Sequence, residues 1–164
     1  KKVVSLAHAA VIAALYVVLT FAANSFGLAS SAIQVRLSEA LTILPFFTPA
    51  AIPGLAAGCL LFNLTFAGAL PLDFLVGTAA SFLAALAMWL TRKVTFKGYP
   101  LPGLLMPALF NAILVGWELA VYIGGGFWLN AAYVAIGEAA VLLTLGSALY
   151  YTMKLRHLDT RIFR

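Results

Sequence analysis

The stretch that decides the fold is IQVRLSEALTILPFFTPAAIPG, residues 33–54, because it places two charged side chains inside strongly apolar sequence. Arg36 and Glu39 are three residues apart, so on a helix they share a face and can simply pair with each other. A charge at the centre of a bilayer costs at least ~2.5 to 3.5 kcal/mol, so an intramembrane charge usually faces the protein interior or a wet cavity. The two charges therefore mark either a local ion pair or part of a binding site.

The composition is that of an integral membrane protein. Of the 164 residues, 64% are hydrophobic and only 9% are charged, whereas about one quarter of the residues in soluble domains are charged. The single cysteine, Cys59, and two distant histidines give neither a disulfide framework nor a metal-ligand spacing, so we expect no metal and no cofactor. The net charge of +5 comes from the two ends and one loop, a distribution that membrane topology explains without nucleic-acid binding.

Apolar stretches separated by turn signals predict the transmembrane helices. Each stretch is close to the ~20 residues that a helix needs to cross hydrocarbon, and each is continuous rather than alternating, which excludes a β-barrel. We therefore expect an all-α membrane protein, a single transmembrane domain over residues 1–164. Prolines at positions 45, 49 and 53 remove backbone donors and predict a tight turn between the second helix and the third. The six expected helices cover residues 3–24, 31–47, 50–69, 72–91, 100–123 and 129–153.

Lysine and arginine concentrate in three segments, namely the N-terminus, the stretch from Arg92 to Lys97, and the chain after Met153. Six crossings put these segments on one side of the membrane, and the positive-inside rule makes that side cytoplasmic. We thus predict that both termini are cytoplasmic. An alternative is that the first apolar run is a cleaved signal peptide ending near Ala29, which would leave five crossings.

The remaining charges, apart from Asp159, lie in membrane or outward-facing parts of the chain, and four of the five are acidic. A rise of ~1.5 Å per residue places all of them in the outer half of the membrane. The spacing puts Asn111 and Glu118 on one face of the fifth helix, and Asp73, Gly77 and Ser81 on one face of the fourth. This set indicates an outward-facing cavity for a small, flat solute that is cationic or rich in hydrogen-bond donors.

Aromatic residues fall at the same depth, where their flat faces can flank a ring. Tryptophans in this position can equally be interfacial belt residues, and asparagines can serve only to bond helices together. The candidate substrate-binding residues are Arg36, Glu39, Asp73, Asn111, Trp117, Glu118, Trp128 and Glu138.

The first helix carries small residues in overlapping pairs four apart, a spacing that lets another helix approach closely. That neighbour is either internal or a separate docking partner. The candidate docking residues are Ala9, Ala10, Ala13 and Ala14. The chain has no phosphate-binding G-x-x-x-x-G-K-[ST] loop and none of the common hydrolase motifs, so we expect a transport protein rather than an enzyme.

The run VRLSEALTILPFFTPAAIPGLAAGCL, together with the alanine-rich first helix, six spans and basic tail, resembles the QueT family of queuosine-precursor transporters. Members are substrate-binding S components of energy-coupling factor (ECF) transporters. The resemblance implies the S-component fold and a multi-pass location in a bacterial cytoplasmic membrane. It implies a 7-deazaguanine substrate such as queuine, preQ1 or preQ0, bound toward the outer face. It also implies a transmembrane coupling protein and two separate ATPase subunits as partners.

Two other functions fit the same residues. The chain can be an S component for another vitamin-like heterocycle, since a set of acids and one arginine suits several cationic rings. It can also be a stand-alone secondary transporter whose buried acids relay protons or sodium ions. Uptake that survives loss of the ATPases but collapses with the ion gradient would select the second alternative.

Overall fold

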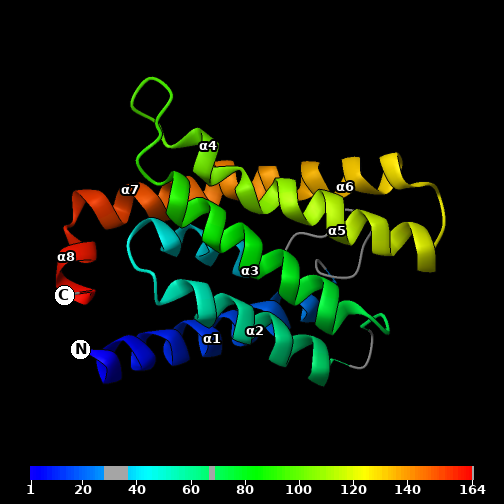
Figure 1. Ribbon diagram of the computed structural model, residues 1–164, viewed down its shortest axis with the longest axis horizontal. Coiled ribbons are helices and arrows are strands. Elements are labelled where there is room, and N and C mark those ends of the chain that lie inside the picture. Colours follow the sequence, from blue (N-terminus) through cyan, green and yellow to red (C-terminus); the bar gives the residue numbers. More distant parts are fainter. Residues whose placement is uncertain (28–36, 67–68, 164) are drawn as a thin grey trace.

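The computed structural model describes residues 1–27, 37–66 and 69–163, and the regular structure in these ranges is helical (Figure 1). An all-α fold is therefore confirmed. The elements, in chain order, are α1 (Lys2–Ser25), η1 (Leu37–Phe46), α2 (Ala51–Thr65), α3 (Asp73–Thr91), α4 (Leu101–Leu104), α5 (Met106–Tyr122), α6 (Phe127–Val141), η2 (Leu142–Gly146), α7 (Ser147–Leu155) and α8 (Leu158–Ile162).

Four helical segments are long and apolar enough to cross a membrane, within the part of the chain that the structure describes. They are Lys2–Ser25, Asp73–Thr91, Leu101–Tyr122 and Phe127–Leu155. Their bounds lie within two residues of the predicted spans. The two remaining predicted spans correspond to η1 and α2, which have only 10 and 15 residues, so the count of six crossings stays a prediction.

The two short segments owe their form to proline. Pro45 lies inside η1, a 3-10 helix, whose rise of ~2.0 Å per residue lets ten residues reach further than an α-helix of that length. Pro53 lies in the first turn of α2. Backbone N–H groups in the first turn have no acceptor within the helix, so the N–H that proline lacks removes no helical hydrogen bond. The third predicted helix, 50–69, was too long, because α2 ends at Thr65. The first part of the second predicted helix, residues 31–36, lies outside the described residues.

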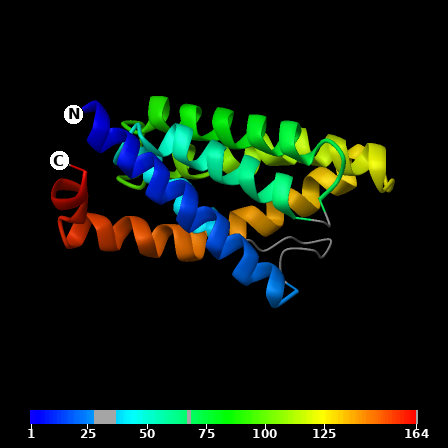
Figure 2. The ribbon, with the colours of Figure 1, turned by 90° about the horizontal axis from the view of Figure 1, so that it is seen from below.

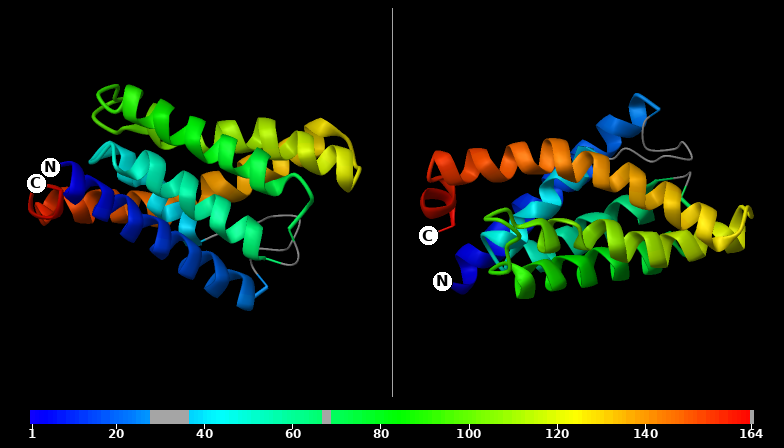
Figure 3. Two further views of the ribbon diagram at one scale, coloured as in Figure 1. Left: turned by 60° about the horizontal axis from the view of Figure 1, so that its bottom comes forward. Right: turned by 90° about the horizontal axis from the view of Figure 1, so that it is seen from above.

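Both described ends of the chain lie at one end of the molecule, together with the connection from α3 to α4 (Figures 1 and 3). The opposite end carries the end of α2, the start of α3 and the connection from α5 to α6. The three basic segments of the sequence are therefore gathered at one end. Their cytoplasmic orientation remains a prediction.

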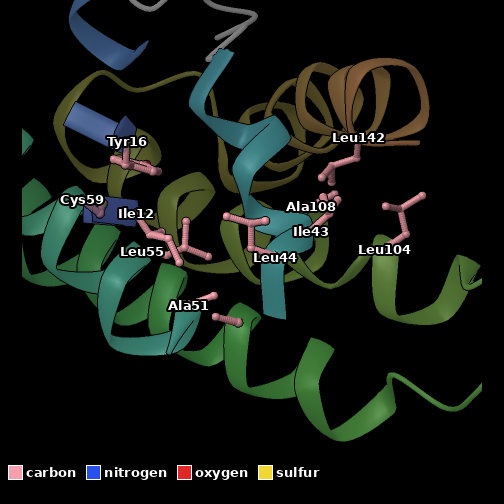
Figure 4. Close-up of a cluster of buried hydrophobic side chains, with 11 residues drawn as sticks. Ile12, Tyr16, Ile43, Leu44, Ala51, Leu55, Cys59, Leu104, Ala108 and Leu142 are labelled. Atoms are coloured by element: carbon pink, nitrogen blue, oxygen red, sulfur yellow. The ribbon is translucent and has the colours of Figure 1, made fainter. Parts of the chain in front are cut away.

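Helices α1 and α2 pack closely through small residues, side by side in both views (Figures 1 and 2). A Cβ built on Gly58 would lie 2.8 Å from Tyr16 Cβ, and one on Gly54 would lie 2.8 Å from the Ala9 carbonyl oxygen. Both distances are shorter than real Cβ contacts, so only glycine fits at these two positions. Near this contact, Ile12, Tyr16 and Leu55 join the buried apolar cluster drawn in Figure 4.

This packing divides the small residues of α1 into two pairs. Ala9 and Ala13 are buried, and Gly54 and Gly58 of α2 approach their carbonyl oxygens. Ala10 and Ala14 are exposed. An internal partner thus accounts for the first pair, whereas only the second pair is available to a separate protein.

The arrangement of the ends predicts the pattern of thiol labelling in intact cells. In a Cys59→Ala background, an impermeant maleimide should label Trp128→Cys strongly and leave Lys97→Cys unlabelled, because the two positions lie at opposite ends. Permeabilised cells provide the control, since both cysteines should then react. Strong labelling of Lys97→Cys in intact cells would contradict the predicted orientation.

Candidate functional site

A cavity of about 160 Å³ lies between the helices, toward the end opposite the termini. Its position follows from its walls, which include residues near the end of α2, the start of α3 and the end of α5. The apolar part of the wall includes Phe62, Phe66, Val115, Leu119 and Val134. The side chains with polar atoms are those of Tyr16, Glu39, Cys59, Asn63, Asp73, Ser81, Asn111 and Glu138.

One polar corner of the cavity is formed by α5 and α6. Asn111 Nδ2 donates a hydrogen bond of 3.0 Å to Glu138 Oε2, and both residues are buried. A buried carboxylate needs such donors because burial removes it from water. The amide therefore holds Glu138 in a defined position on the cavity wall.

A second polar corner lies where α2 meets α3. Asn63 Nδ2 donates to the main-chain oxygen of Asp73 at 3.0 Å, and Asp73 Oδ2 accepts from the Leu70 backbone N–H at 2.6 Å. Asp73 is the first residue of α3, where the helix dipole favours a negative charge. We call this pair the Asn63–Asp73 corner.

Glu39 reaches the cavity from η1 and is only 4% exposed. The neighbouring residue, Ser38, fixes the beginning of η1 against α1. The hydroxyl groups of Ser38 and Thr20 are joined by a 2.7 Å hydrogen bond, and both residues are fully buried. This hydrogen bond joins η1 to α1.

Four of the eight predicted substrate-binding residues line the cavity, namely Glu39, Asp73, Asn111 and Glu138. The prediction that Asp73, Gly77 and Ser81 share one face of their helix is confirmed, because all three residues line the cavity.

The other four predicted residues have different positions. Glu118 is fully buried but is not part of the cavity wall. The structure does not bring the two tryptophans to the cavity either, since Trp117 is 49% exposed and Trp128 is 83% exposed. Arg36 lies outside the described residues.

The sequence prediction missed the aromatic wall, which is built from Tyr16, Phe62 and Phe66. Asn63 was not among the predicted substrate-binding residues, and the structure shows that it both bonds α3 and lines the cavity. The four-residue spacing of Cys59 and Asn63, matching that of Asp73 and Gly77, was the available signal that α2 contributes a polar face.

A protein-family model described as QueT transporter matches residues 6–155. The chain belongs to the QueT transporter family. This confirms the resemblance seen in the sequence and, with the apolar helices, makes the protein a multi-pass membrane transporter. Neither a curated protein nor a solved structure matches the chain.

The hydrogen bond between Asn111 and Glu138 predicts energetic coupling between the two residues. In a double-mutant cycle of Asn111→Ala and Glu138→Ala, we expect a coupling free energy of about 0.6 to 1.7 kcal/mol, between the average and the maximum found for interhelical hydrogen bonds in a membrane protein. Equilibrium unfolding in mixed detergent micelles measures it. A matched cycle of Asn111→Ala with Asp159→Ala should be additive, and additivity in both cycles would show that the bond contributes nothing to stability.

Proposed function

We propose that this QueT family member is the substrate-binding S component of an ECF transporter and that it takes up a 7-deazaguanine across a bacterial cytoplasmic membrane. The observation that carries this proposal is the cavity. Its described lining contains three carboxylates, those of Glu39, Asp73 and Glu138, and no lysine or arginine. Such a wall suits a ligand that presents several N–H donors.

The Watson–Crick edge of a deazaguanine supplies these donors. A ring N–H and an exocyclic amino group lie side by side on that edge, and a carboxylate can accept from both. Glu138 is the proposed acceptor, because Asn111 already fixes its orientation. The second N–H of the Asn111 amide is the proposed donor to the ring carbonyl oxygen.

The size of the cavity favours a ligand of this class. Pockets for drug-sized ligands measure roughly 300 to 1,000 Å³, whereas this cavity measures about 160 Å³. A single small heterocycle matches it better than riboflavin, which carries three fused rings and a ribityl chain. The rings of Tyr16 and Phe62 give the cavity flat apolar surface against which a base can pack.

Binding measurements test the substrate assignment. The purified protein should bind 7-deazaguanines and not thiamine, biotin or riboflavin. Glu138→Gln should weaken binding at least about tenfold, a loss of ~1.4 kcal/mol, because a ligand donor is left buried without an ionic acceptor. Isothermal titration calorimetry in detergent measures the affinity.

Asp159→Asn is the matched control, because it makes the same type of change in α8, at the end of the molecule away from the cavity. Its affinity should equal that of the unmodified protein. Tight binding of a vitamin with no response to any deazaguanine would overturn the substrate assignment and leave the fold unaffected.

The proposed coupling protein docks on the exposed small residues of α1, Ala10 and Ala14. A tryptophan at position 10 should block co-purification with the coupling protein while ligand binding persists, because the residue points away from the α1–α2 contact. Ala132→Trp, on an exposed position of α6, is the control. Equal assembly of the two variants would refute docking through this face of α1.

A further inference from the structure

The Asn63–Asp73 corner lines the cavity at a place that the ring-binding proposal does not use. We propose that this corner binds the ammonium group of the ligand's side chain, so that the protein selects amine-bearing 7-deazaguanines over neutral ones. The inference rests on the proposed function and deepens it, since it names the part of the wall that discriminates among the possible precursors.

The orientation of the Asn63 amide is determined by its partners. Nδ2 donates to the Asp73 main-chain oxygen at 3.0 Å and lies 3.5 Å from Cys59 Sγ. A carbonyl oxygen can only accept, so the amide nitrogen must face Asp73, and the amide oxygen is turned away from it. Asn63 is 92% buried, being 8% exposed, and no donor among the described residues pairs with Oδ1.

Asp73 adds a negative charge next to this oxygen. Its Oδ2 is occupied by the Leu70 backbone N–H, while Oδ1 accepts no hydrogen bond from the residues that the structure describes. The corner therefore offers two acceptor oxygens, one of them ionised, and directs its own donors to the protein backbone and Cys59. An ammonium group, which has three donors and no acceptor, is the complementary ligand group.

Gly77 keeps the Asn63 amide in place. It follows Asp73 by one turn of α3, and a Cβ at this position would lie 2.9 Å from Asn63 Nδ2 and 3.4 Å from Cys59 Sγ. Any side chain at position 77 would push the amide away from its bond to Asp73. Gly77 is thus a positioning residue for the corner.

The other polar corner suits a different part of the ligand. Asn111 brings an N–H donor beside Glu138, and this donor suits a ring carbonyl oxygen. The two corners, on different helix pairs, therefore fit different parts of one ligand. The ring edge meets α5 and α6, and the charged substituent meets α2 and α3.

The test compares two ligands with one ring system, the 7-aminomethyl and the 7-cyano forms of 7-deazaguanine, by calorimetry on the full chain in detergent. The unmodified protein should bind the amine at least about tenfold more tightly than the nitrile, because only the amine supplies a charged donor. Asp73→Asn and Asn63→Ala should each reduce amine affinity at least about tenfold and change nitrile affinity less than about twofold. Gly77→Ala should act in the same direction.

The controls are Asp159→Asn and Asn24→Ala, which make the same chemical changes at residues outside the cavity wall. Asp73→Asn keeps an acceptor for the Leu70 N–H, and nitrile binding reports whether each variant is folded. If Asp73→Asn bound neither ligand, the amine and nitrile affinities of Asn63→Ala and Gly77→Ala would test the inference instead.

Equal weakening of both ligands in the folded variants would overturn the inference, because it would show a general role in shaping the cavity. Equal affinity of the unmodified protein for amine and nitrile would also overturn it, while the proposed function would stand. Failure of the unmodified protein to bind either base would instead refute the proposed function itself.

Discussion

The rest of the structure depends on one constraint, the cost of burying carboxylates in an apolar helical bundle. Glu39, Glu118 and Glu138 are at most 8% exposed in a chain whose residues are 64% hydrophobic. A buried charge must be compensated by donors or by an opposite charge, and a half-satisfied site is unstable. The helices are therefore arranged so that polar groups from one reach the acids of another, as Asn111 of α5 does for Glu138 of α6.

The same constraint explains how the acids of the cavity wall are held in place. Donors that the protein provides, such as the Leu70 N–H and the Asn111 amide, each occupy one carboxylate oxygen. The bond from the Leu70 N–H fixes Asp73 without using all of its accepting capacity, since an ionised carboxylate has about four acceptor sites. In the proposed function, a ligand that brings its own donors adds to this network.

Glycines outside the cavity wall let neighbouring helices pack closely. Gly54 and Gly58 let α2 lie against α1, and Gly116 lets α5 lie against α6, where a Cβ would be 2.9 Å from Ala131 Cα. Two irregular segments, η1 and η2, also pack against each other. Gly146 lies in η2, a π-helical turn, and allows η1 to approach. A Cβ at this position would lie only 3.3 Å from Ile43 Cγ2. The Ser147 hydroxyl bonds the Leu142 carbonyl at 3.2 Å, which supplies that main-chain acceptor with a donor within the turn.

The sequence by itself determined the fold class and the long helices. Apolar runs such as Lys2–Ser25 and Asp73–Thr91 are continuous, and in lipid a continuous apolar run can satisfy its backbone only as a helix. The sequence also singled out four residues that line the cavity, because polar groups in apolar sequence are costly and so stand out. They are Glu39, Asp73, Asn111 and Glu138.

Only the tertiary structure decided which side of each helix faces the cavity. Trp117 and Trp128 were predicted at the depth of the acids, yet they are exposed, whereas Tyr16 and Phe62 supply the aromatic wall. On helices that are apolar all round, periodicity carries little information about the inward face, because lipid and protein interior accept the same side chains. Depth along a helix follows from counting residues, but rotation about its axis depends on packing against its neighbours.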